Sequence, residues 1–118
     1  MKIISILIAL LGFSSVNNNN DITADVVATR YCSCAKENNL VSAANIYKEA
    51  KDNELKQKAK GDYLVSLRKT QECIKMQEVQ EAVRKLPREQ RTQFEKNVMK
   101  ILTERCGEVA LALQLNRQ

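Results

Sequence analysis

The sequence has no histidine and no tryptophan, and it has one proline, three glycines, three tyrosines and two phenylalanines. The absence of histidine excludes Ser-His-Asp and Cys-His catalysis and removes the commonest general base. The glycines stand at positions 12, 61 and 107, so no glycine-rich phosphate loop can form. Carboxylate pairs such as Glu78 and Glu81 lie among basic residues at helical spacing, which is typical of surface charge networks. We therefore expect a protein that is not an enzyme and that has no cofactor.

The scarcity of proline and glycine predicts helices, since the chain is instead rich in Lys, Glu, Gln, Leu and Ala. Because aromatic side chains are few, the core must be built mostly from Leu, Ile, Val, Ala and Met. A core of that kind in a chain of 118 residues would gain from covalent cross-links. The length is enough for one domain only.

Positive charge is in modest excess, with 19 Lys and Arg against 14 Asp and Glu and a net charge of +5. The two signs are interleaved along the chain, a pattern typical of a solvated helical surface. The alternative interpretation is attraction to an acidic partner, such as an anionic membrane surface or nucleic acid. We expect no nucleic-acid partner, because the chain has no recognisable motif for one and an export signal precedes the domain.

The export signal is predicted over residues 1–16. Lys2 supplies a positive charge, and an apolar region of 11 residues, Ile3–Phe13, follows it. The small residues of the expected cleavage region are Gly12, Ser14 and Ser15. The apolar region is shorter than the roughly 20 residues that a membrane span requires, so we expect no transmembrane span in the mature chain.

The chain after the signal divides into two parts. Residues 17–21 include a run of four asparagines and are expected to form a flexible mature N-terminus. Residues 22–118 are expected to form the helical, disulfide-bonded domain. The signal predicts a secreted or periplasmic location.

A first helix is expected to begin at Ile22, where Asp21 can cap it, and to end at Asn38 and Asn39. Asparagine tolerates the left-handed conformation that often closes a helix. Apolar residues recur along this segment at spacings of three and four, which places them on one helical face. They are Ala24, Val27, Tyr31 and Cys34.

A second helix is expected over residues 40–59, with Gly61 as the break that follows it. Its apolar face consists of Ala43, Ile46 or Tyr47, and Ala50, and it can extend to Leu55. The stretch Lys51–Lys60 is almost wholly polar. It is either a solvated extension of the helix or a frayed connector.

A third helix is expected over residues 62–86 and a fourth from Pro87 to about Leu115, since proline disfavours helix in the residue before it and suits a first turn. The apolar face of the third helix consists of Leu64, Leu67, Cys73, Met76, Val79, Val83 and Leu86. That of the fourth consists of Phe94, Val98, Ile101 or Leu102, Val109 and Leu113. Short connections favour antiparallel neighbours, so we expect an all-α fold, a small up-down bundle of three or four helices. The three-helix variant applies if residues 40–60 pack only loosely.

Four cysteines follow the signal, at Cys32, Cys34, Cys73 and Cys106, and this usage predicts two disulfides. A metal site built from four thiolates is the alternative. No histidine is present to complete a mixed metal site. The thioredoxin-type pair of cysteines separated by two residues is also absent.

Helix geometry favours the pairs Cys32–Cys106 and Cys34–Cys73. Residues two apart are about 200° apart around a helix, so Cys32 and Cys34 point to opposite flanks and need different partners. In a four-helix bundle the first and third helices run parallel, and Cys106 returns roughly 7 Å beyond the level of Cys73, toward the side of Cys32. In a three-helix bundle the first helix can run against the third, and the pairing would then invert.

The segment from Ala28, Ala-x-x-Tyr-Cys-Ser-Cys-Ala, is followed by the lone Cys73 and then by Phe94 and Cys106. This arrangement resembles small secreted helical proteins of Bacteroidota that carry a Cys-x-Cys in the first helix and two later helical cysteines. The resemblance covers most of the mature chain. It implies a helical fold and export, and it implies no activity.

A second resemblance is to the small periplasmic chaperones that carry a Leu-Thr-x-x-Gln motif at a helix start. The run Leu86-Pro87-Arg88-Glu89-Gln90 opens the expected fourth helix in a similar way, although proline replaces the threonine. We expect an exported non-enzymatic helical module with a structural or protein-interaction role and a protein or envelope partner. The alternatives are a chaperone-like or apolar-ligand-binding protein and, secondly, a metal-binding protein.

Overall fold

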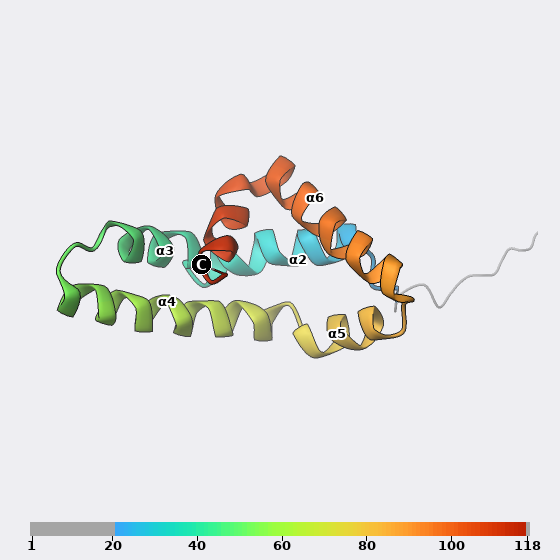
Figure 1. Ribbon diagram of the computed structural model, residues 1–118, viewed down its shortest axis with the longest axis horizontal. Helices are drawn as coiled ribbons and strands as arrows, with labels where there is room; N and C mark the ends of the chain where they lie inside the picture. The colour runs from blue at the N-terminus through green and yellow to red at the C-terminus, as the bar shows by residue number, and fades with distance from the viewer. Residues whose placement is uncertain (1–20, 118) are drawn as a thin grey trace, which may run out of the picture.

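The computed structural model describes residues 21–117, which are all-α and contain no strand (Figure 1). The predicted signal peptide, its expected cleavage region at Gly12, Ser14 and Ser15, and nearly all of the expected flexible N-terminus lie outside the described residues. Five helices make up the described part: α2 (Ala24–Glu37), α3 (Leu40–Glu49), α4 (Asn53–Cys73), α5 (Met76–Arg84) and α6 (Arg88–Leu115). The expectation of an all-α fold with two disulfides is confirmed.

The helices form three antiparallel lengths of chain (Figure 1). Helices α2 and α3 follow one another in nearly the same direction, α4 and α5 return alongside them, and α6 runs back in the direction of α2. The described part therefore has more helices than the three or four expected, because two of the lengths are broken. It also follows that α2 runs against α4, whereas the expected four-helix bundle had the corresponding helices parallel.

The start of α2 differs from the expectation by two residues. The side chain of Thr23, and not that of Asp21, caps the helix by accepting a hydrogen bond from the Val26 N–H at 3.2 Å. With Thr23 as the cap, Ile22 precedes the helix and Val27 lies in its second turn, and both pack into the core. This pairing of apolar positions is that of a hydrophobic staple, which favours a helix that begins after Thr23.

The end of α2 is the one expected. Asn39 adopts the left-handed conformation, with φ of 55°, and α3 begins immediately after it at fully buried Leu40. The Asn38 side chain donates to the Cys34 carbonyl at 2.9 Å, and the Asn38 carbonyl accepts from the Ser66 hydroxyl at 2.6 Å. These two bonds satisfy the helix end and attach it to α4.

The expected break at Gly61 is wrong. The chain turns instead at residues 50–52, where the Asp52 side chain caps α4 by accepting from the Glu54 N–H at 2.8 Å. Gly61 is exposed inside α4, and a methyl group added there would meet nothing within 4 Å. The polar stretch after Asp52 is thus neither an extension of the helix that begins at Leu40 nor a frayed connector. It is the solvated first part of α4, in which Ala59 is buried and Leu55 is 61% exposed.

The expected third helix is interrupted at Lys75, which separates α4 from α5. Lys75 has φ of 61°, a left-handed conformation that a lysine side chain disfavours, so the sequence carried no signal for the break. The neighbouring Ile74 is fully buried, and its carbonyl accepts a hydrogen bond from Arg30 on α2 at 3.0 Å. Burial of Ile74 and this bond hold the break in place.

The core lies where α2 is enclosed by α4 on one side and α6 on the other, with Leu102 among its fully buried side chains. The Tyr63 hydroxyl is buried there and donates to the carbonyl of Ala112 at 2.5 Å. Tyr63 and Leu67 form the inner face of α4, and Leu64, expected on that face, is 41% exposed. The buried face of α4 follows the spacing of three and four residues through Ala59, Tyr63, Ser66, Leu67 and Thr70.

Candidate functional site

The two disulfides are the pairs expected from the sequence. Cys32 on α2 is bonded to Cys106 on α6, with their Cα atoms 5.9 Å apart, and Cys34 on α2 is bonded to Cys73 on α4, with a Cα separation of 5.8 Å. Helix α2 therefore carries one bridge to each of its two larger neighbours. The opposite orientation of Cys32 and Cys34 accounts for this division.

The helix directions behind the expected pairing are nevertheless wrong. Since α2 runs against α4, we expected the pairing to invert, and it does not. The side of α2 to which each cysteine points determines its partner, because α4 and α6 lie on different sides of α2. The position of the cysteines along the helix axes does not determine the pairing. A departure from helical geometry at Cys106 itself, where φ is −150° and ψ is 67°, bends α6 at the bridge and removes the simple relation between residue number and level.

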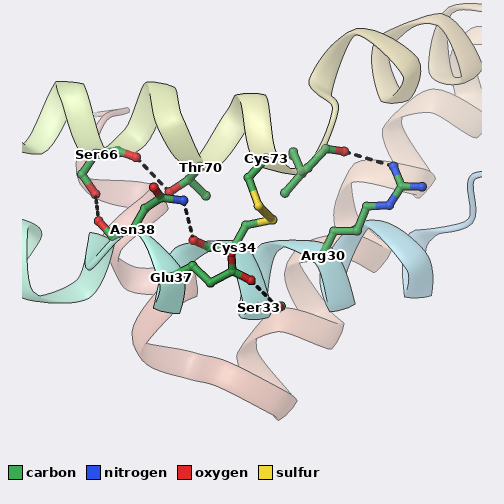
Figure 2. Close-up of a disulfide and its surroundings, with 9 residues drawn as sticks. Arg30, Ser33, Cys34, Glu37, Asn38, Ser66, Thr70 and Cys73 are labelled. Atoms are coloured by element: carbon green, nitrogen blue, oxygen red, sulfur yellow. Dashed lines mark hydrogen bonds between the residues drawn. A yellow bond between two sulfur atoms is a disulfide. The ribbon is translucent and has the colours of Figure 1, made fainter.

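The bridge between Cys34 and Cys73 sits within a set of helix-end hydrogen bonds (Figure 2). On one side of it, the Thr70 hydroxyl donates to the Ser66 carbonyl at 2.8 Å, while Ser66 itself bonds to the end of α2. On the other side, Arg30 donates to the Ile74 carbonyl. These contacts give the bridge a structural role, in which it fixes α2 against the end of α4.

None of the four cysteines is a free thiol. The four-thiolate metal site considered from the sequence is therefore incompatible with this oxidised form. The part of the chain from residue 21 to 117 holds no group of three or more Cys, Asp or Glu side chains arranged to bind a metal ion.

A cleft of about 690 Å³ lies between α2, the end of α4, α5 and α6. Its walls carry apolar side chains from all of these elements. Helix α5 contributes Met76, Val79 and Val83, and α6 contributes Phe94, Val98, Met99 and Leu102. From α2 and α4 come Val27, Tyr31 and Leu67.

The cleft exists because α5 is short and displaced by the break at Lys75. Helix α5 has nine residues, and its apolar side chains recur at the spacing of one helical face. That face turns toward α6, yet α5 packs far less closely on its neighbours than α2 packs on α6. The space left between the two apolar faces is the cleft.

The remaining side chains around the cleft are polar or basic. Arg84, Arg91 and Arg117 line it, with Glu95 as the acidic residue among them. The Arg91 Nε group donates to the Leu86 carbonyl at 2.9 Å. Within residues 21–117, no carboxylate forms an ion pair with any of the three arginines. The cleft therefore combines apolar walls with an excess of positive charge.

Tyr31 lies in the cleft wall close enough to Arg117 for the two groups to interact. Burial raises the pKa of the Tyr31 phenol above its usual value of 10.0, and the positive charge of Arg117 partly offsets that increase. The phenol thus stays protonated at neutral pH. It presents a neutral hydroxyl group beside the apolar wall.

Most of the apolar lining residues were expected on buried helix faces, but the sequence predicted no cleft and no role for Arg84 or Arg91. The sequence does show an arginine on each side of the turn at Pro87. That these arginines lie in a cleft depends on the break at Lys75, which the residue types do not reveal.

Within the part of the chain that the structure describes, no helix combines the length and the apolar character of a membrane span. The chain matches no protein-family model, and no curated protein or solved structure is significantly similar to it.

Proposed function

We propose that this chain is an exported, non-enzymatic binding protein that holds an apolar ligand in the cleft between α2, α5 and α6. The observation that carries the proposal is the cleft itself, which has apolar walls on three sides. Its volume of about 690 Å³ falls within the range of pockets that bind small organic ligands. Of the functions that the sequence leaves open, apolar-ligand binding uses this feature most directly.

The walls are suited to a ligand without a fixed shape. Met76 and Met99 stand on opposite helices, and methionine side chains adapt to irregular apolar surfaces because they are unbranched and polarisable. Val79 and Val98 also line the cleft and are buried, so they form a more fixed part of its wall. An apolar molecule in the cleft would gain roughly 25 cal/mol for each Å² of apolar surface removed from water.

Export is part of the proposal for two reasons. The first 16 residues have the layout of a cleavable signal peptide. Both pairs of cysteines form disulfides, which persist in secreted and periplasmic proteins and are rare in the reducing cytosol. A binding protein in such a compartment would need the bridges to keep a small core intact around an open cleft.

The test is binding of N-phenyl-1-naphthylamine, a neutral apolar dye that fluoresces in apolar surroundings, to the disulfide-bonded chain. We expect saturable binding that Val83→Glu weakens by about tenfold or more, because the new charge would face the apolar wall. Val65→Glu is the matched control, since Val65 is 42% exposed on α4 and does not line the cleft.

Circular dichroism shows whether each variant keeps its helices, and Val83→Thr, which is nearly the same size, serves if Val83→Glu does not fold. Equal binding by the Val83 and Val65 variants, or no saturable binding by the parent chain, would contradict the proposal.

A further inference from the structure

We propose that the ligand of the cleft is a long-chain carboxylate, whose alkyl chain lies along the apolar walls and whose headgroup pairs with Arg84 and Arg91. This proposal rests on the proposed function, because it names the chemistry of the molecule held in the same cleft. The cleft has two chemically different parts: apolar walls formed by α5 and α6, and a basic end where these helices meet.

The basic end is formed by the connection between the two helices. Arg84 is the last residue of α5, and Arg91 lies in the first turns of α6, so the short segment 85–87 brings both into the cleft lining. The bond from Arg91 Nε to the Leu86 carbonyl fixes the position of that guanidinium group. Among the described residues this is its one side-chain hydrogen bond, so its terminal amino groups can donate to a ligand oxygen.

The charges at this end favour an anion. Arg84 and Arg91 place two positive charges in the lining at this end, and Glu95, one turn after Arg91, offsets at most one of them. No carboxylate among residues 21–117 is in ion-pair contact with either arginine. A ligand carboxylate would balance this excess charge and accept the paired N–H groups that arginine offers to planar oxyanions.

The walls indicate that the anion carries a chain. Phe94, Val98 and Leu102 lie at successive turns of α6 and continue the lining away from Arg91, over about 12 Å of helix. Opposite them, Met76 and Val79 of α5 belong to the same lining. A small inorganic anion would leave this surface exposed to water, whereas an alkyl chain attached to the carboxylate would cover it.

The experiment compares dodecanoate with dodecanol, which has the same chain and no charge, by isothermal titration calorimetry on the disulfide-bonded chain below the aggregation limit of each ligand. We expect dodecanoate to bind more tightly than dodecanol. Arg84→Gln and Arg91→Gln should each weaken the binding of dodecanoate by about tenfold, as expected for loss of a hydrogen bond to a charged group. Each should change the binding of dodecanol by less than about twofold.

A further arginine variant serves as the control. Arg88→Gln removes a charge from the same turn but from a residue outside the cleft lining. It should change dodecanoate binding by less than about threefold, because only general electrostatic attraction is lost.

Equal affinity for dodecanoate and dodecanol would overturn the carboxylate proposal and leave apolar binding intact. The same follows if Arg88→Gln weakens dodecanoate binding as much as Arg84→Gln and Arg91→Gln do. Failure of both ligands to bind would overturn the proposed function as well. A stable dimer in sedimentation equilibrium that excludes both ligands would show that a second copy covers the cleft, and would likewise overturn the proposal.

Discussion

Single residues hold this small fold together by attaching helix ends to one another. Tyr63 shows the effect best, because its ring is almost wholly buried and its hydroxyl reaches the Ala112 carbonyl near the end of α6. Arg30 and Ser66 act in a similar way at the ends of α4 and α2. Each bond satisfies a carbonyl that the helix itself leaves without a partner.

Tyr63→Phe should lower the free energy of unfolding by about 1–2 kcal/mol, because a buried carbonyl loses its donor while the ring packing is retained. Tyr47→Phe is the matched control, since the Tyr47 ring lies 5.8 Å from that of Tyr63 and its hydroxyl makes no hydrogen bond to another described residue. Urea unfolding of both variants measures the difference. Equal losses in the two variants would show that the bond to Ala112 contributes nothing.

At the scale of elements, the breaks between helices determine the architecture. Asn38 and Asn39 marked the first break in the sequence, because asparagine tolerates the left-handed conformation. Lys75 gave no indication of the second break, since lysine is common inside helices and rare at positive φ. Gly61 suggested a break that does not exist, because the cap at Asp52 starts α4 earlier and an exposed helix tolerates one glycine.

Lys75→Gly should therefore raise the free energy of unfolding by about 0.5–1 kcal/mol, because glycine adopts positive φ without strain. The control is Lys60→Gly in the exposed middle of α4, where glycine should lower stability by about 1 kcal/mol. Thermal unfolding followed by circular dichroism distinguishes the two. A loss of stability in Lys75→Gly as large as that in Lys60→Gly would contradict the role assigned to this position.

The same breaks explain how far the site was predictable. The apolar face of α5 and that of α6 were recognisable from their helical spacing, and most of their members line the cleft. Whether two such faces meet or stand apart depends on where the chain turns between α4 and α5. That turn rests on burial of Ile74 and a bond from Arg30, which are tertiary contacts between residues 44 apart.

For the whole molecule, the two disulfides connect α2 to α4 and to α6. They close separations of 39 and 74 residues, and in the chain-entropy model each is worth about 4 kcal/mol. A core made mostly of alanine and valine with few large side chains gains much of its stability in this way. The pairing itself followed from the 200° angle between Cys32 and Cys34, whereas the helix directions could not be deduced from spacing alone.

The double variant Cys32→Ser/Cys106→Ser should lose about 4 kcal/mol of unfolding free energy. It should also lose affinity for apolar dyes, because the bend of α6 at Cys106 is no longer tied to α2 and the cleft wall on α6 can shift. Urea unfolding and dye titration measure the two effects. A variant as stable as the parent chain would show that the bridge to α6 is dispensable.

The central claim is that the cleft between α2, α5 and α6 holds an alkyl chain, and intermolecular NOE contacts test it most directly. The chain would be labelled with ¹³C in its methyl groups and saturated with unlabelled dodecanoate. We predict contacts from the ligand methylenes to methyl groups of Met76, Val79 and Val98, and none to those of exposed Ile46 and Leu55. Contacts confined to Ile46 and Leu55, or the absence of any contact to the cleft methyl groups at saturation, would contradict the claim.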